Sequence, residues 1–126
     1  MLLLAALSLH NLEEALTYAG SRPRAAALIG WFQPGLEAPE PASFHAALLL
    51  VSLGAAVLLL WAAHTQAERA GWLAVRATAL VLLVNVFVPH VPAAIAFGGY
   101  APGVVTALAV NLPLGLWLLT RPRPRP

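Results

Sequence analysis

The hydrophobic pattern of this chain consists of long apolar segments separated by short polar or turn-forming stretches. A helix that crosses the hydrocarbon core of a bilayer needs about 20 mostly apolar residues. Segments of roughly this length cover residues 2–19, 42–63, 72–88 and 103–119. Antiparallel neighbours joined by short turns form up-and-down bundles. The pattern therefore predicts an all-α fold, a four-transmembrane-helix up-and-down bundle.

The connector between the first two predicted helices, residues 20–43, is the longest. Its Gly20-Ser21-Arg22-Pro23-Arg24 stretch predicts the end of the first helix, because glycine and proline interrupt helices. Residues 25–32 are apolar and end in Trp31-Phe32, which predicts a helix lying in the membrane interface. We expect this connector to form either a surface loop or a lid. The whole is predicted to be one transmembrane domain, residues 1–120, followed by an Arg-Pro tail, residues 121–126.

Composition places the chain in the membrane class. Of its 126 residues, 60% are hydrophobic and only 10% are charged, whereas soluble domains average about 25% charged residues. The net charge of +2 comes from seven arginines, three of which lie in the tail. Without a folded basic face, these arginines indicate an anchor near anionic headgroups and no nucleic-acid partner.

The arginines also predict the topology of the bundle. With both termini in the cytoplasm, Arg69, Arg76 and the three tail arginines lie inside, whereas Arg22 and Arg24 lie outside. Cytoplasmic loops carry the excess of basic residues in membrane proteins. We therefore expect a multi-pass protein with cytoplasmic N- and C-termini.

The polar stretch His10-Asn11-Leu12-Glu13-Glu14 interrupts the first apolar segment. Residues three and four apart share a helix face, so Glu13 and Glu14 lie on the same face as His10, one turn further along the helix. Charged groups at membrane depth cost about 2.5–3.5 kcal/mol each on insertion scales and usually mark a functional site. The alternative is a self-neutralised patch that only holds helices together.

Alternating helix direction brings further polar residues to the same end of the predicted bundle. The end of the first helix, the start of the second, the end of the third and the start of the fourth share one membrane face, predicted to be the outer one. His64 falls at the opposite face and is excluded. The residues expected to join the motif are His45, Asn85, His90, Tyr100, Thr106 and Asn111.

These side chains permit two kinds of chemistry. Imidazole and carboxylate groups bind zinc, iron or manganese, and the candidate metal ligands are His10, His45 and His90 with Glu14 or Glu13. Without a metal, Glu13 and Glu14 could act as an acid–base couple. In either case Asn85, Tyr100 and Asn111 would orient a substrate or stabilise developing charge.

With these residues assembled, the chain resembles the HXXEE-motif family of small bacterial integral membrane proteins. The resemblance rests on the motif at residues 10–14, on Phe44-His45, on residues 85–90, and on residues 100–106 with Leu112-Pro113 after them. It implies a location in the bacterial inner (cytoplasmic) membrane and a membrane-embedded enzyme, but no settled activity. In the family pattern Asn and His are often four apart, whereas Asn85 and His90 are five apart with Pro89 between them.

The leading functional prediction is an enzyme that acts on an apolar or amphiphilic small molecule by metal-assisted hydrolysis or hydration. A metal-free acid–base isomerase or cyclase is the second hypothesis, and a carrier or binding protein for a metal ion or small lipid is the third. A purely structural subunit remains as the last alternative. Small residues such as Gly54 and Gly115 are compatible with a homo-oligomer in the bilayer.

Overall fold

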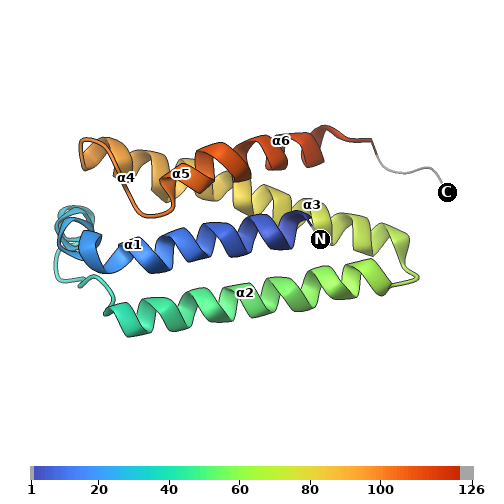
Figure 1. The fold of residues 1–126 in the computed structure, drawn as a ribbon, viewed down its shortest axis with the longest axis horizontal. Coiled ribbons are helices and arrows are strands. Elements are labelled where there is room, and N and C mark those ends of the chain that lie inside the picture. Colours follow the sequence, from blue (N-terminus) through green and yellow to red (C-terminus); the bar gives the residue numbers. More distant parts are fainter. Residues whose placement is uncertain (1, 123–126) are drawn as a thin grey trace.

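The computed structural model describes residues 2–122, and these residues form helices and turns without a strand (Figure 1). Helices α1 and α2 are each a single element. The remaining elements form two consecutive groups, α3–η1–α4 and α5–η2–α6. The bounds are α1 (Leu2–Phe32), α2 (Pro41–His64), α3 (Glu68–Asn85), η1 (Val86–His90), α4 (Val91–Ala96), α5 (Val104–Thr106), η2 (Ala107–Asn111) and α6 (Leu112–Thr120). The all-α prediction is confirmed for the described residues.

The helical rods lie side by side with alternating direction (Figure 1). Helix α1 packs on α2, α2 packs on α3, and α3 packs on α6. Two helices, Pro41–His64 and Glu68–Ala96, are long and apolar enough to cross a membrane, and Val104–Thr120 is apolar but shorter. The chain therefore has the composition and the helix lengths of a membrane protein in at least these two segments.

Helix α1 continues beyond the predicted end at Gly20, so that boundary and the long loop at residues 20–43 were wrong. The helix includes Pro23 and ends at Phe32. Proline lacks an N–H and bends a helix, but neighbouring hydrogen bonds can carry the helix through it. In Figure 1 the last part of α1 turns away from the bundle axis and is seen nearly end-on. Residues 25–32 are helical, as predicted, although they belong to α1.

The third predicted helix also extends further than its expected end at Val88. Helix α3 passes into the π-helical segment η1, which contains Pro89, and then into α4. Val88 has extended dihedrals (φ −145°, ψ 105°), so the chain changes direction there before it resumes the helix. The boundaries of α2 and of the α5–α6 group differ from the predicted ones by one residue or two.

Small residues allow close helix contacts in the half of the bundle that holds the start of α1 and the end of α6. A Cβ on Gly115 would lie 3.3 Å from the carbonyl oxygen of Ala79, so α6 sits almost against the α3 backbone. Leu3 and Leu7 pack with Ala79 and Leu82 to form the apolar core.

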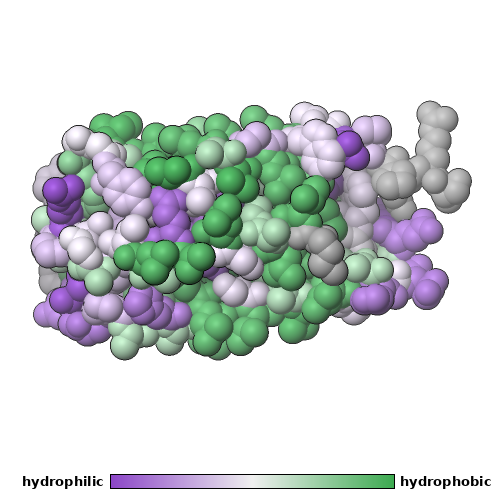
Figure 2. All heavy atoms as spheres, viewed as in Figure 1, coloured by the Kyte–Doolittle hydropathy of each residue, from purple (hydrophilic) through white to green (hydrophobic). Residues whose placement is uncertain are grey.

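Helix α2 has no buried residue, and hydrophobic residues cover the middle of the face seen in Figure 2.

Arginines stack on tryptophans at one end of the bundle. The Arg76 guanidinium lies 4.7 Å from the Trp72 ring centroid, and that of Arg121 lies 3.6 Å from the Trp117 ring centroid. Arg76 also donates to the carbonyl of Arg121 at 3.3 Å. The remainder of the predicted Arg-Pro tail, residues 123–126, lies outside the described residues.

Candidate functional site

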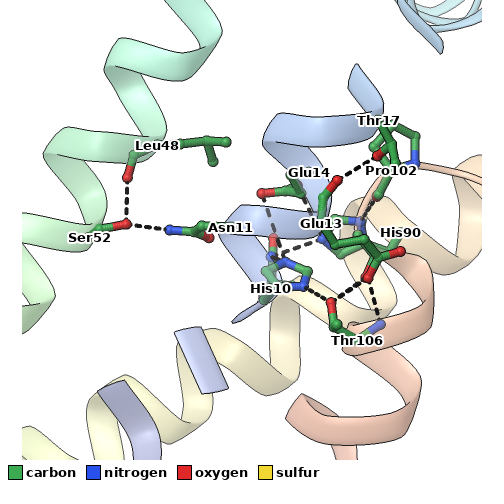
Figure 3. A network of polar contacts seen from close by, with 12 residues as sticks. His10, Asn11, Glu13, Glu14, Thr17, Leu48, Ser52, His90, Pro102 and Thr106 are labelled. Atoms are coloured by element: carbon green, nitrogen blue, oxygen red, sulfur yellow. Dashed lines mark hydrogen bonds and ion pairs between the residues drawn. The ribbon is translucent and has the colours of Figure 1, made fainter. Parts of the chain in front are cut away.

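Two buried imidazoles form the centre of the polar cluster shown in Figure 3. His10 of α1 is 0% exposed and His90 of η1 is 2% exposed, with ring centroids 4.6 Å apart in an edge-to-face arrangement. The side-chain amide nitrogen of Asn85 lies 3.0 Å from Nε2 of each ring. Asn85 therefore joins the last turn of α3 to both histidines.

The hydrogen bonds at the opposite ring nitrogens fix the tautomer of each histidine. Nδ1 of His90 lies 2.7 Å from the carbonyl oxygen of Pro102, which can only accept, so Nδ1 carries the proton. Nδ1 of His10 lies 3.0 Å from the Thr106 hydroxyl, which donates its own proton to Glu13 at 2.6 Å. Nδ1 of His10 is therefore also the donor. Both Nε2 lone pairs are left to face the centre of the cluster.

The Glu14 carboxylate closes this cluster on the third side. Its Oε2 lies 3.9 Å from Nε2 of His10, and its Oε1 lies 3.6 Å from Nε2 of His90. One ligand atom from each of the three residues lies within 4.8 Å of the others. The Glu14 side chain is only 13% exposed. The amide nitrogen of Asn85 only donates, so both Nε2 atoms are acceptors, and they converge with the carboxylate in a donor set that suits zinc, iron or manganese.

Glu13, the neighbouring carboxylate, has a different environment. Its Oε2 accepts from the backbone N–H of Thr106 at 2.7 Å and from the Thr106 hydroxyl. Its Oε1 accepts from the Tyr100 hydroxyl at 2.8 Å and from the backbone N–H of Val105 at 3.2 Å. Glu13 therefore caps the start of α5, where helical N–H groups lack intrahelical partners. It holds α5 against α1 and, through Thr106, orients His10.

Tyr100 lies in the turn between α4 and α5 and is 40% exposed. Its partial burial and the Glu13 carboxylate raise the pKa of Tyr100 above the usual value, although other hydrogen bonds offset part of this rise. The phenol therefore stays protonated at neutral pH and remains a donor to Glu13. Tyr100 contacts the capping carboxylate rather than the imidazole–Glu14 cluster.

Gly103 lies at the point where the three converging side chains meet the chain before α5. It has a positive φ of 77°, and a Cβ there would lie 2.7 Å from Cε1 of His90, 2.8 Å from Cγ of Glu14 and 2.8 Å from Cε1 of His10. Only glycine meets both the backbone and the space requirement at this position. The close approach of this backbone closes the cluster on the α5 side.

The interruption of the helix at Val88 is what brings Asn85 and His90 to the same site. In a continuous α-helix, residues five apart lie on different faces, because each residue adds about 100° of rotation. The extended dihedrals of Val88 change that relation, so both side chains face His10.

A cavity of about 200 Å³ adjoins the cluster, and Glu14 and His90 form part of its wall. The remaining lining is mostly apolar and comes from α1, α2, α4 and the turn before α5. The Tyr18 and Phe44 rings, which also line it, are stacked with centroids 3.7 Å apart. Space for a small apolar group therefore lies next to the converging lone pairs.

The structure does not bring every predicted site residue into this cluster. Nε2 of His45 lies 3.0 Å from the carbonyl oxygen of Ala15, on the exposed side of α1. Asn111 is fully buried at the end of η2, and neither of its side-chain polar atoms has a partner among the described residues. His10, Glu14, Asn85 and His90 form the cluster, with Glu13 and Tyr100 behind it.

Sequence reasoning did not assign roles to Thr106, Gly103 or Asn11. The Thr106 hydroxyl donates to Glu13 and accepts from His10, so it links the two side chains. In the sequence, the feature that could have indicated this role was a single hydroxyl residue near the start of an apolar helix. Asn11 is buried and donates to the Ser52 hydroxyl at 2.7 Å, which joins α1 to α2 (Figure 3). Its position within the motif was the available signal.

No curated protein and no solved structure matches the chain. A family model described as "Protein of unknown function with HXXEE motif" matches residues 1–118, which include the motif, both clustered histidines and Asn85. The chain therefore belongs to the HXXEE-motif family.

Proposed function

We propose that this protein is a membrane-embedded enzyme that holds a divalent metal at His10, His90 and Glu14. The reaction we assign is metal-assisted hydrolysis or hydration of an apolar or amphiphilic substrate. The observation that carries the proposal is the convergence of two Nε2 lone pairs and one carboxylate within 4.8 Å. The Asn85 amide nitrogen lies 3.0 Å from the same two Nε2 atoms, so metal binding requires this amide to turn away from both rings.

The spacing of the donor atoms supports a metal. Zinc binds nitrogen at about 2.0–2.1 Å and oxygen at about 2.0–2.2 Å, so tetrahedral ligand atoms lie about 3.4 Å apart. The Glu14 oxygens lie 3.6 and 3.9 Å from the two Nε2 atoms, slightly too far for hydrogen bonds. Small side-chain movements are enough to reach metal distances.

The outer contacts of the ligands support the same proposal. Metal-binding histidines usually donate their other N–H to a carbonyl or carboxylate, which fixes the tautomer. His90 donates to the carbonyl of Pro102, and His10 donates to Thr106, which is bonded to Glu13. Three protein ligands leave a further position for water or substrate, as in catalytic zinc sites.

The chemistry follows from the site and its adjoining cavity. A divalent metal bound there supplies Lewis acidity and a water nucleophile at neutral pH. Glu14 lines both the cluster and the cavity, so it is placed to bind the metal or to take a proton from the attacking water. The cavity of about 200 Å³ has room for about seven groups of water size.

The proposed setting is a four-span bundle in the bacterial inner membrane with both termini in the cytoplasm. The antiparallel rods in Figure 1 and the apolar surface in Figure 2 support it. Arg22 and Arg24 then lie at the outer face, opposite Arg69 and Arg76, in agreement with the excess of basic residues on the cytoplasmic side. The site lies in the outer half of the bundle.

Metal analysis of the detergent-purified chain tests the proposal directly. We expect about one zinc, iron or manganese ion per chain, with X-ray absorption showing nitrogen ligands at about 2.0–2.1 Å for zinc. The His10→Ala variant should lose this metal. His45→Ala is the matched control and should keep it, because His45 lies outside the cluster. A folded chain that binds none of these ions would contradict the proposal.

Thr106→Val tests the outer contacts of the site. Valine keeps the shape of threonine but removes the hydroxyl that links Glu13 to His10. Loss of an outer hydrogen-bond partner typically weakens metal affinity about 10–100-fold. We expect a loss in that range, measured by competition with a zinc chelator. Thr78→Val is the control, because Thr78 bonds only to the carbonyl of Ala74 in its own helix.

A metal-free acid–base enzyme is the second candidate, and the position of Asn85 favours it. The two hydrogens of the Asn85 amide can satisfy both Nε2 lone pairs without any ion. Glu14 would then be the proton-transfer group at the cavity. Activity that survives complete chelation and vanishes in Glu14→Gln would support this candidate over the metal enzyme.

A further inference from the structure

Three hollows meet along the last part of α1, around Leu28. The cavity at Glu14 and His90 shares Leu28 and Phe97 with an open hollow of about 390 Å³ beside Arg24 and Trp31. A third hollow, of about 420 Å³, shares Leu28 with the first and lies beside Phe32. A continuous set of apolar walls thus runs from the turned end of α1 to the candidate site.

Arg24 lines the hollow beside Trp31, and its guanidinium group has no partner among the described residues. Within residues 2–122 it forms no hydrogen bond or ion pair, whereas Arg22 donates to the Pro39 and Ala38 carbonyls and pairs with Glu40. Arg24 is exposed and lines the same hollow as Trp31, which is 77% exposed. Its charge is therefore available to a ligand.

We infer that these hollows bind one membrane lipid with an anionic headgroup. The headgroup phosphate lies at Arg24 beside Trp31, and an acyl chain passes Leu28 and Phe97 toward Glu14 and His90. This deepens the proposed function by naming its substrate class, and it rests on that function only for the reaction, not for the binding.

The chemistry of the two ends matches such a lipid. Tryptophan and arginine are favoured at the membrane interface, where headgroups lie, and arginine donates two parallel hydrogen bonds to phosphate oxygens. Between Arg24 and the pair Glu14 and His90, the walls are formed by aliphatic, aromatic and proline side chains, which suit a hydrocarbon chain.

The distance between the ends also fits. Arg24 and Glu14 are ten residues apart in α1, about 15 Å along a straight helix and less along a bent one. Half of a hydrocarbon core of about 30 Å is the same length. One acyl chain of a single leaflet can therefore reach from the Arg24 hollow to the cavity at Glu14.

Trp31 provides a direct reporter of this binding. The chain is placed in nanodiscs that contain phospholipids brominated near the headgroup end of the chains, either phosphatidylglycerol or phosphatidylcholine. Bromine quenches tryptophan at short range, and the Trp31→Phe variant is subtracted to isolate Trp31 emission. We expect phosphatidylglycerol to quench Trp31 at about a fivefold lower mole fraction than phosphatidylcholine does. A factor of about five corresponds to the attraction between one arginine and an anionic lipid.

Variants assign this preference to Arg24. Arg24→Gln should remove the fivefold difference, and Arg24→Lys should keep most of it. Arg69→Gln, at the opposite end of the bundle, is the control and should retain it. The preference should also weaken as salt increases, because exposed charges are screened. Equal quenching by both lipids, or a preference unchanged in Arg24→Gln, would overturn the inference.

Metal analysis keeps this result separate from the proposed enzyme. Arg24→Gln should bind the same amount of metal as the unaltered chain, since Arg24 lies outside the cluster. A lipid preference in a chain that binds no metal would retain the lipid site and reject the metal enzyme. Metal binding without a lipid preference would retain the metal site and reject the lipid site.

Discussion

Gly103→Ala is expected to weaken divalent metal binding at the cluster severely. The added methyl would lie 2.7 Å from His90 and 2.8 Å from both Glu14 and His10, closer than real Cβ contacts allow. All three proposed ligands would have to move, so we expect metal affinity to fall by more than about 100-fold, beyond the loss typical of outer-shell changes. Chelator competition measures this loss.

The same substitution should lower the free energy of unfolding. Overpacking of a well-packed site costs about 1–3 kcal/mol, and a left-handed conformation costs a non-glycine residue about 1–2 kcal/mol more. Gly98→Ala separates the two effects, because Gly98 has a similar φ of 68° but nothing within 4 Å of its Cβ position. Equal metal affinity in the two variants would contradict the crowding argument.

Glu14→Gln and Glu13→Gln are expected to have opposite consequences, although the two residues are adjacent. Glutamine at residue 14 removes the anionic ligand that faces both Nε2 atoms, so metal affinity should fall by more than about 100-fold. The folded state should change little, because Glu14 forms no hydrogen bond within the described residues. Metal titration and thermal unfolding measure both effects.

Glutamine at residue 13 removes the charge of a carboxylate that accepts four hydrogen bonds. Charge-assisted hydrogen bonds contribute about 1.5–3 kcal/mol each, and their losses are not additive. We expect the free energy of unfolding to fall by about 2–4 kcal/mol, with a metal affinity change of at most the outer-shell range of about 10–100-fold. Loss of metal in Glu13→Gln without loss of stability would reverse the assigned roles.

Helix positions could be predicted where the hydrophobic pattern decides them. The apolar runs at residues 42–63 and 103–119 agree closely with α2 and the α5–α6 group. The prediction failed at Pro23, which lies within the continuous helix α1, and beyond Pro89, where the helix resumes after the interruption at Val88. A proline removes one backbone hydrogen bond, and whether the helix ends or only bends depends on the surrounding packing, which a local pattern does not contain.

The site could be predicted in part for a similar reason. Helical periodicity alone places Glu13 and Glu14 below His10, and it correctly singles out the motif that lies at the cluster. It cannot distinguish the two carboxylates. The distinction depends on α5, whose N–H groups bond Glu13 and leave Glu14 free to face the imidazoles.

The sequence by itself determined the all-helical fold, the apolar character of the rods and the polar face of α1, because these follow from residue type and spacing within one helix. The tertiary structure decided which distant residues share that face. The break at Val88 brought His90 to His10, and the left-handed Gly103 brought the start of α5 against both. His45 lies outside because α2 packs against a different side of α1. Contacts between helices depend on backbone bends and close approach, and no local spacing rule specifies them.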